Sequence, residues 1–284
     1  MTDAGGHAAD AHMAGAHAAG SRATESHANE SRAAESHAAD TEAASREIPA
    51  LELVEWPRRP TPGAPGAAIF DLDGTLVDTV PLRVAGWVAT FAEFGMRVEP
   101  GWLHLLMGAD GHLVAREGGR MAGRVIDDRM AERIDHVSGE HFNRLNEVPR
   151  PLPGAADLLR ELAAAGLPHA IATASRAGQV LASVDALGLP SRPTIVDGSH
   201  VRHAKPAPDL LLLAARRLHV PPEACWYVGD SIWDMQAARA AGMVAAGVTT
   251  GFATPADLER AGADLVATDL EELRGRMTVN SRGT

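Results

Sequence analysis

The chain has 284 residues, which is enough for a sizeable core, and 45% of them are hydrophobic. Its formal net charge of −11 at pH 7 argues against a nucleic-acid surface, because phosphate backbones are bound by basic patches, and its single cysteine excludes an internal disulfide and a cysteine-rich zinc site. It has neither an apolar run of eighteen residues nor the layout of a signal peptide, so we expect a cytoplasmic protein that binds neither nucleic acid nor membranes.

Residues 1–46 are dominated by alanine, histidine, serine and acidic residues, in a near-repeat of five residues that starts at Gly6. A five-residue period advances about 140° per repeat around an α-helix, so the repeat forms no fixed apolar face. We therefore predict a disordered, low-complexity tail, although its histidines could gather a transition metal or respond to mild acid. Residues 47–66 are rich in proline and are predicted to be a linker with one short extended piece at residues 51–54.

The stretch AAIFDLDGTLVDT at residues 67–79 places two carboxylates directly after an apolar segment. Ala67–Phe70 is predicted to be a short strand buried on both faces, and Gly74 allows a sharp turn after it. Alternate residues of an extended chain point the same way, so Asp71 and Asp73 should project together into the crevice where parallel sheets bind ligands. Because close burial of like charges is costly without a cation, the arrangement predicts a Mg²⁺ site and an anionic substrate.

Residues 81–150 are predicted to be helical, with no strand among them. Trp87 and Phe91 follow helical spacing, and Gly95 is expected to end that helix. Residues 108–112 form a glycine-containing, flexible break, and residues 124–146 form a long amphipathic stretch. The pattern indicates a helical unit inserted after the first strand.

From Pro151 onward, apolar strand-like segments alternate with helical ones. Such alternation predicts an α/β fold with a doubly wound parallel sheet. The strands are expected at residues 169–173, 194–196, 226–228, 244–248 and 264–267, and the helices at residues 155–165, 177–187, 210–218 and 234–241. The apolar neighbours of Cys225 predict a buried thiol, and residues 277–284 are expected to be a frayed C-terminus.

Three segments of this α/β region carry polar groups, two of them at strand ends. Thr173 ends one strand in the sequence ATAS, and Lys205 stands in KPAPD, where the prolines give a stiff support to a point charge. Asp230 and Asp234 stand in GDSIWD, after an apolar strand and one helical turn apart. Both carboxylates can therefore face one cation.

Together with DLDGT, these segments resemble, in order, the four motifs of the haloacid dehalogenase-like (HAD) superfamily, over roughly residues 67–275. The resemblance implies a Rossmann-like HAD core at residues 67–80 and 151–276. It makes residues 81–150 a helical cap that closes over the site and selects the substrate. The cap loop resembles that of the phosphoglycolate-phosphatase-like branch of small-metabolite phosphatases. The implied activity is Mg²⁺-dependent hydrolysis of a small phosphorylated metabolite, a phosphomonoester, through an aspartyl-phosphate.

The resemblance assigns a role to each motif residue. Asp71 would be the nucleophile and Asp73 the general acid and base. The phosphate ligands would be Thr173, Ser175 and Lys205. The Mg²⁺ ligands would be the side chains of Asp71 and Asp230 and the backbone carbonyl of Asp73, with Asp234 in support.

Other activities of the superfamily fit less well. Dehalogenases lack the second aspartate of the first motif, which is Asp73 here. Sugar phosphomutases carry a histidine where Arg83 stands and basic residues where residues 108–112 stand, so mutase activity is a disfavoured alternative. A non-catalytic HAD-fold binding module would have no chemical need for the full set of motif residues. Asp110 and His112 of the cap loop are candidates for substrate specificity or, alternatively, for a helix cap, and the sequence names neither the substrate nor the oligomeric state.

Overall fold

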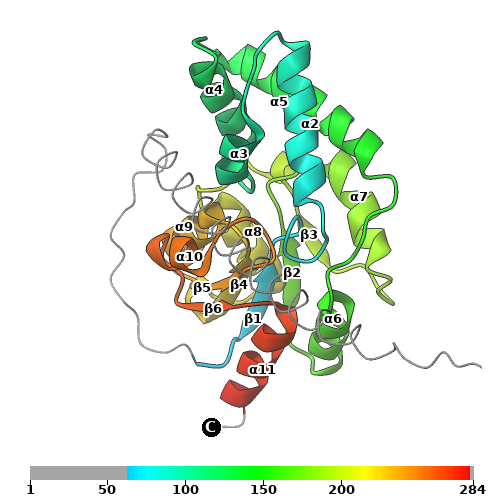
Figure 1. The fold of residues 1–284 in the computed structure, drawn as a ribbon. Helices are drawn as coiled ribbons and strands as arrows, with labels where there is room; N and C mark the ends of the chain where they lie inside the picture. The colour runs from blue at the N-terminus through cyan, green and yellow to red at the C-terminus, as the bar shows by residue number, and fades with distance from the viewer. Residues whose placement is uncertain (1–62, 282–284) are drawn as a thin grey trace, which may run out of the picture. The chain divides into compact units, whose positions relative to one another are not determined.

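The computed structural model of the protein describes residues 63–281 (Figure 1). The predicted tail, residues 1–46, lies outside the described residues, as does most of the predicted linker with its extended piece at residues 51–54. The described part contains one six-stranded sheet with helices on both faces, and a group of helices inserted after the first strand. None of its helices combines the length and the apolar character that crossing a membrane requires.

Six parallel strands form the sheet, in the order β3-β2-β1-β4-β5-β6. They are β1 (Ala67–Phe70), β2 (His169–Ala172), β3 (Thr194–Val196), β4 (Cys225–Gly229), β5 (Val244–Val248) and β6 (Leu265–Ala267). The strands run outward in sequence order on both sides of β1, so the winding of the sheet reverses between β1 and β4. Ligands bind outside the carboxyl ends of the strands at such a point. The predicted doubly wound parallel sheet is confirmed.

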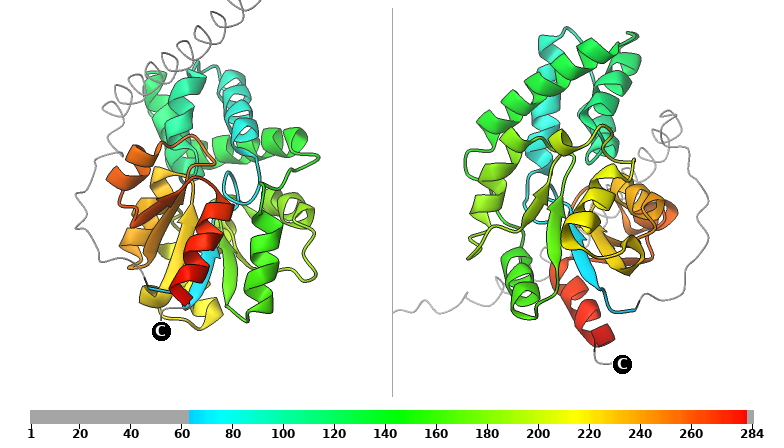
Figure 2. Two further views of the ribbon diagram at one scale, coloured as in Figure 1. Left: turned by 60° about the horizontal axis from the view of Figure 1, so that its bottom comes forward. Right: turned by 180° about the vertical axis from the view of Figure 1, so that it is seen from behind.

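Helices cover both faces of this sheet (Figure 2). One face packs against α6 (Ala155–Ala164), α7 (Ala177–Ala186) and α11 (Leu270–Ser281), and the other against α8 (Asp209–Leu218), α9 (Ile232–Ala240) and α10 (Pro255–Arg260). Strand β1 contributes Ala68 and Phe70 to the first layer and Ala67 and Ile69 to the second. Because alternate strand residues point to opposite faces, an unbroken apolar run is what a strand buried on both faces needs.

The C-terminal region differs from the sequence-based expectation in two ways. Helices α10 and α11 were not anticipated, and α11 continues to Ser281, into the segment 277–284 that was expected to fray. Leu270, Leu273 and Met277 are buried in the core at helical spacing. This spacing explains why the helix persists there. Cys225, by contrast, is buried as predicted.

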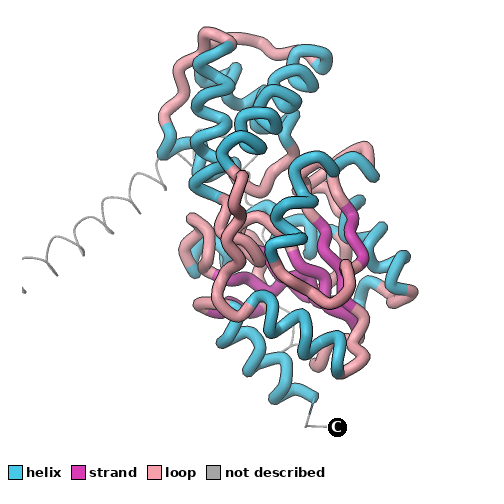
Figure 3. Tube along the Cα trace, turned by 90° about the vertical axis from the view of Figure 1, so that its right-hand side faces the viewer, coloured by secondary structure: helices cyan, strands magenta, loops and turns pink. Residues whose placement is uncertain are grey.

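Helices make up the inserted unit between β1 and α6. They are α2 (Val80–Glu93), α3 (Pro100–Leu103), the short 3₁₀ helix η2 (His104–Leu106), α4 (Gly111–Met121) and α5 (Asp128–Leu145). Figure 3 shows them grouped together, with all the strands in the other part of the described chain. The expected break at residues 108–112 is the turn between η2 and α4, where Gly108 has a φ of +90°. We refer to this unit as the cap.

Candidate active site

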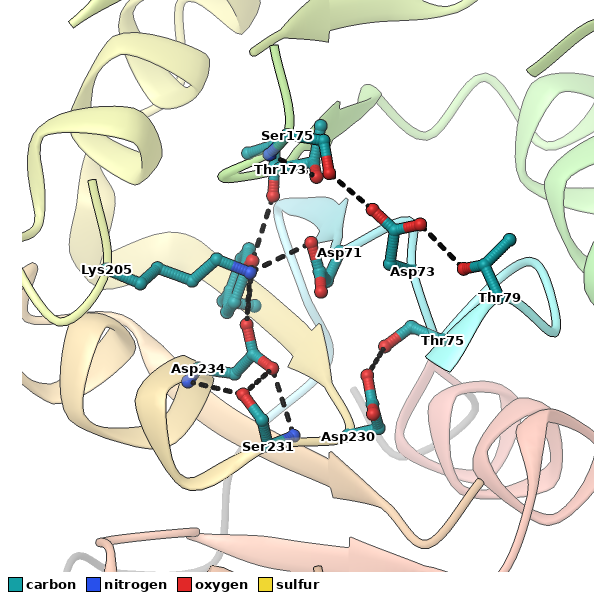
Figure 4. Close-up of polar contacts among 12 residues, drawn as sticks. Asp71, Asp73, Thr75, Thr79, Thr173, Ser175, Lys205, Asp230, Ser231 and Asp234 are labelled. Carbon is teal, nitrogen blue, oxygen red and sulfur yellow. Dashed lines mark hydrogen bonds and ion pairs between the residues drawn. The ribbon is translucent and has the colours of Figure 1, made fainter. Parts of the chain in front are cut away.

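The first carboxylates of the site leave the carboxyl end of β1. Gly74 turns the chain directly after Asp73 with a φ of +80°, and a Cβ atom there would overlap the carboxylate of Asp230. A side chain at this position would therefore be both strained and obstructed. Thr75 Oγ1 donates a hydrogen bond of 2.8 Å to Asp230 Oδ1 (Figure 4). The turn after β1 and the end of β4 are thus joined at the point where the winding reverses.

Lys205 is completely buried among these carboxylates. Its Nζ lies 2.9 Å from Asp71 Oδ1 and 2.7 Å from Asp234 Oδ1. Burial alone would lower the pKa of Lys205, but the two carboxylates outweigh that effect and raise it above its ordinary value. The amine is therefore a fixed positive charge that faces Asp71 (Figure 4).

Asp234 is held by donors on both of its carboxylate oxygens. Oδ1 accepts from Lys205 Nζ and lies 3.1 Å from the Tyr227 hydroxyl, and Oδ2 accepts from the backbone N–H and the hydroxyl of Ser231, at 3.0 and 2.6 Å. Ser231 and Asp234 form the capping box that begins α9. Asp234 is thus built into the helix start, where it orients Lys205.

Three buried carboxylates, those of Asp71, Asp230 and Asp234, have oxygens within 4.8 Å of one another. Lys205 supplies one positive charge against these three. Burial, and then the neighbouring carboxylates, raise the pKa of Asp71 to about 7 against the lowering effect of Lys205, and burial with Asp234 and Asp71 raises the pKa of Asp230 well above its usual range. The cluster has an excess of negative charge and offers only oxygen ligands. A Mg²⁺ ion fits both properties.

Asp73 faces the cap rather than the Lys205 cluster. Its Oδ1 accepts from Thr79 Oγ1 at 2.6 Å, and its Oδ2 accepts from Ser175 Oγ at 2.5 Å and from Arg83 at 2.9 Å. Burial alone would raise the pKa of Asp73, but the charge of Arg83 and the hydrogen bonds from Ser175 and Thr79 outweigh it and lower the pKa. Arg83 comes from helix α2, so a cap residue holds the carboxylate expected to be the general acid and base.

Two of the expected phosphate ligands, Thr173 and Ser175, follow the end of β2 and line the same pocket as Asp71 and the third, Lys205. Thr173 is buried, and its Oγ1 accepts from the Ser175 backbone N–H at 3.1 Å. Ser175 Oγ accepts from Arg83 at 2.6 Å and donates to Asp73. Ser175 therefore helps to orient Asp73 in this arrangement.

A second charged cluster joins the cap to the loop after β2. Arg176 lies 2.9 Å from Asp135 Oδ2 through Nε and 2.8 Å from both carboxylate oxygens of Glu132 through its two terminal nitrogens. Glu132 is also 2.8 Å from His112 Nε2. Burial raises the pKa of Asp135, whereas the hydrogen bond from Arg176 lowers the pKa of Glu132. We call Arg176, Glu132, Asp135 and His112 the cap–core cluster.

The two cap residues expected to govern specificity, Asp110 and His112, are not among the residues that line the pocket. Asp110 begins α4, where its Oδ1 accepts from the His112 backbone N–H and its Oδ2 accepts from the Ala204 backbone N–H, at 2.8 and 3.0 Å. The helix-cap alternative therefore describes its contacts. An effect of Asp110 or His112 on substrate choice stays a prediction. It would be indirect, because Asp110 accepts from the residue before Lys205 and His112 contacts Glu132, a partner of Arg176.

The pocket has a polar floor, an apolar roof and a polar wall. The floor residues from the core are Asp71, Asp73, Thr173, Lys205 and Asp230. The apolar roof residues from the cap are Val80, Trp87, Leu106, Met107 and Val114. The wall, where α5 of the cap faces α7 and the loop after β2, consists of Arg83, Asp135, Ser138, Arg176 and Gln179.

Sequence reasoning missed most of this wall. Arg83 was considered only as the replacement of a mutase histidine, and Asp135, Arg176 and Gln179 were not singled out. Their proximity depends on the packing of α2 against α5 and of α5 against α7, for which no local pattern exists. A signal was present for Asp234, because Ser231 three residues earlier completes a capping-box spacing.

Comparisons with known proteins agree with this geometry. Residues 68–248, more than half of the chain, match the family model described as haloacid dehalogenase-like hydrolase. Hexitol phosphatase A of Escherichia coli K12 is 33% identical over 208 residues, covering 72% of this chain and 91% of that protein. Phosphoglycolate phosphatase of the same strain is 30% identical over 230 residues, covering 72% and 89%. The crystal structure of a hydrolase from Pseudomonas syringae has a TM-score of 0.72 and 34% identity, covering 75% of this chain and 98% of that one.

Proposed function

This chain belongs to the haloacid dehalogenase-like hydrolases, and from that membership we propose that it is a Mg²⁺-dependent phosphatase that forms an aspartyl-phosphate on Asp71. It hydrolyses small phosphorylated metabolites, as the names of its relatives imply. The observation that carries the proposal is the placement of Asp71. This buried carboxylate lies 2.9 Å from the Lys205 amine, at the floor of a pocket that the cap roofs over.

Asp71 is the proposed nucleophile. An oxygen of its carboxylate attacks phosphorus while the bond from phosphorus to the ester oxygen breaks, and the alcohol leaves. Water then attacks the phosphorus of the aspartyl-phosphate, which releases phosphate and restores the carboxylate. Lys205 and Thr173 bind the phosphoryl oxygens as their negative charge changes during transfer.

Magnesium has a defined place in this proposal. Asp71 and Asp230 would hold it through their side chains and Asp73 through its backbone carbonyl, and the ion supplies charge neutralisation on the phosphoryl group. Asp234, whose carboxylate oxygens accept from Lys205 and Ser231, supports the site by orienting Lys205.

Asp73 is proposed to give a proton to the leaving alcohol and later to take one from water. Both of its carboxylate oxygens already accept hydrogen bonds, from Thr79, Ser175 and Arg83. Proton transfer therefore requires Asp73 to exchange one of these partners for the substrate.

The test is a phosphate-release assay over a panel of small phosphate esters, with Mg²⁺, with a chelator and with Mg²⁺ restored. We expect activity that disappears with the chelator and returns with Mg²⁺. Undiminished activity after thorough metal removal would overturn the metal role of Asp230. Failure to release phosphate from any ester, including the activated p-nitrophenyl phosphate, would overturn the phosphatase and favour the binding-module alternative.

A further inference from the structure

The wall of the pocket has no spare positive charge. Arg83 is paired with Asp73 at 2.9 Å, and Arg176 is paired with Asp135 at 2.9 Å and with Glu132 at 2.8 Å. Lys205, the remaining cation in the pocket lining formed by residues 63–281, already faces two carboxylates and belongs to the phosphoryl end. A carboxylate or a second phosphate on the substrate would therefore meet Asp135 and Asp73 without a cation to balance it. Such burial of like charge is unfavourable.

The wall does offer hydrogen-bonding groups that have no partner within residues 63–281. Asp135 Oδ2 is paired with Arg176, but Oδ1 accepts no hydrogen bond there. Gln179 Oε1 accepts from Arg83, whereas its Nε2 amide donates to none of these residues, and the Ser138 hydroxyl also has no partner among them. The set consists of an acceptor, a donor and a hydroxyl that can do both. A chain of substrate hydroxyl groups, each both a donor and an acceptor, matches this set.

Two glycines leave the space that these side chains occupy. A Cβ atom at Gly111 would overlap the Asp135 carboxylate, and one at Gly139 would overlap the Gln179 amide. Gly139 lies inside α5, where glycine has a lower helix propensity than alanine. Gln179 can approach α5 this closely only because residue 139 has no side chain. The packing of the wall therefore accounts for a residue of low helix propensity at this position.

We propose that the substrate is a phosphate ester of a neutral, hydroxyl-rich compound, a polyol or sugar, and that Asp135 is the specificity-determining residue that rejects acidic substrates. The inference rests on the proposed phosphatase function. The ester's phosphoryl group lies at the Lys205 end, and its hydroxyl groups bind to Asp135, Ser138 and Gln179. Arg176 holds Asp135 in place and is itself neutralised by it.

The test uses two esters that differ in one terminal group. Glucitol 6-phosphate and 6-phosphogluconate share a six-carbon polyol chain, but the second ends in a carboxylate. We expect kcat/KM of the wild-type protein to be at least about tenfold higher for glucitol 6-phosphate, the scale set by an unpaired charge in a binding site. An equal or higher value for 6-phosphogluconate would overturn the inference. The pair glycerol 3-phosphate and 3-phosphoglycerate repeats the comparison on a shorter chain.

The variant Asp135→Asn keeps the size of the side chain and removes its charge. We expect its preference for the neutral ester to shrink or invert, chiefly because KM for 6-phosphogluconate falls. The matched control is Asp128→Asn on the same helix, where the aspartate side chain is 96% exposed and pairs with Arg116 outside the pocket lining. This control should leave both kcat/KM values unchanged. If Asp135→Asn changes kcat/KM for the two esters by the same factor, Asp135 does not discriminate between substrates by their charge.

A second variant covers the case in which Asp135→Asn does not fold. Ser138→Ala should raise KM for glucitol 6-phosphate severalfold more than KM for p-nitrophenyl phosphate, which has no hydroxyl chain. Equal effects on both esters, or none, would remove Ser138 from the proposed hydroxyl site. Hydrolysis of p-nitrophenyl phosphate also separates the two failures: where it proceeds without any preference within the matched pairs, only the substrate inference fails. Where no ester is hydrolysed, the proposed phosphatase function fails.

Discussion

The floor and the wall of the pocket both consist of charged side chains, but their charges are balanced differently. At the floor, Asp71, Asp230 and Asp234 surround one buried amine, and the pKa values of Asp71 and Asp230 are raised by burial and by their like-charged neighbours. At the wall, each arginine already has a carboxylate partner. Buried charge that the protein itself leaves uncompensated indicates a charged ligand, whereas compensated charge indicates a neutral one. The predictions below test this contrast.

The largest effect is expected from Asp71→Asn, at the floor. An amide of the same size cannot attack phosphorus, so turnover should be abolished. Removal of one negative charge from the buried cluster should leave the fold intact, because Lys205 keeps its contact with Asp234. Phosphate release and the melting temperature Tm are the two measurements, and the exposed control Asp128→Asn should change neither. Turnover like that of the wild type would remove Asp71 as the nucleophile.

Binding of Mg²⁺ at the floor should stabilise the folded protein as well as support catalysis. A ligand that binds only the folded state raises Tm by mass action, so we expect Tm of the metal-free protein to rise on titration with MgCl₂. An equal ionic strength of NaCl controls for screening. In Asp230→Asn the shift should largely disappear, because the cluster loses one of its carboxylates. An unchanged shift in this variant would mean that the ion binds elsewhere.

Asp73 is the floor residue that pairs with Arg83 of the wall, and Asp73→Asn should affect two substrates differently. An alkyl phosphate needs a proton on its leaving group, so the rate should fall by about 10²–10⁴, the usual contribution of general acid–base catalysis. An activated aryl phosphate has a leaving group that is already a weak base, so the first step should be largely spared while hydrolysis of the aspartyl-phosphate slows.

Rapid-mixing measurements of phenolate release from the Asp73→Asn variant distinguish these steps. We expect a burst equal to the enzyme concentration, followed by a slow steady state. The wild-type protein, which keeps the base, should show no such separation of phases. Equal slowing of both substrates, with no phosphorylated enzyme to trap, would make Asp73 a structural residue.

The contrast between floor and wall also explains how much the sequence could predict. Asp71, Lys205 and Asp230 stand in short segments whose spacing identifies them. Asp71 and Asp230 follow the ends of neighbouring parallel strands, so their meeting point follows from the sheet, and Lys205 precedes a segment stiffened by prolines. The wall has no such spacing. Arg83 and Asp135 lie on two cap helices, and their partners come from the turn after β1, from α7 and from the loop before α7. Such contacts depend on how whole helices pack.

Similar reasons explain the differences in the fold. The sheet was predictable because the apolar runs of its strands are local signals. Helix α11 was overlooked although Leu270, Leu273 and Met277 have helical spacing, because charged residues separate them and the chain end suggested fraying. The two specificity candidates of the cap loop were chosen as its polar residues. Asp110 instead forms hydrogen bonds with two backbone N–H groups, a local role that its position before α4 also predicts.

The smallest effect is expected at the outer edge of the wall, from Glu132→Gln in the cap–core cluster. The Glu132 side chain is 53% exposed, so its pairing with Arg176 should contribute less than about 1 kcal/mol to the free energy of unfolding. The hydrogen bond from Arg176 lowers the pKa of Glu132 in the folded state below the usual 4.5. A carboxyl group with a depressed folded-state pKa contributes stability that is fully present above its unfolded-state pKa and is lost as the pH falls through the folded-state value. The difference in unfolding free energy between wild type and variant should therefore be constant above pH 4.5 and vanish at lower pH.

Chemical denaturation at a series of pH values measures this difference, and Glu140→Gln is its matched control. Glu140 lies on the same helix with a side chain 54% exposed and pairs with His136, away from the core. If Glu132→Gln and Glu140→Gln have the same unfolding free energy at every pH, the cap–core cluster contributes no stability of its own. A loss of several kcal/mol in Glu132→Gln would instead show that Asp135 alone does not compensate the charge of Arg176. The charges of the wall would then be incompletely compensated, as those of the floor are. The contrast between the wall and the floor would no longer hold.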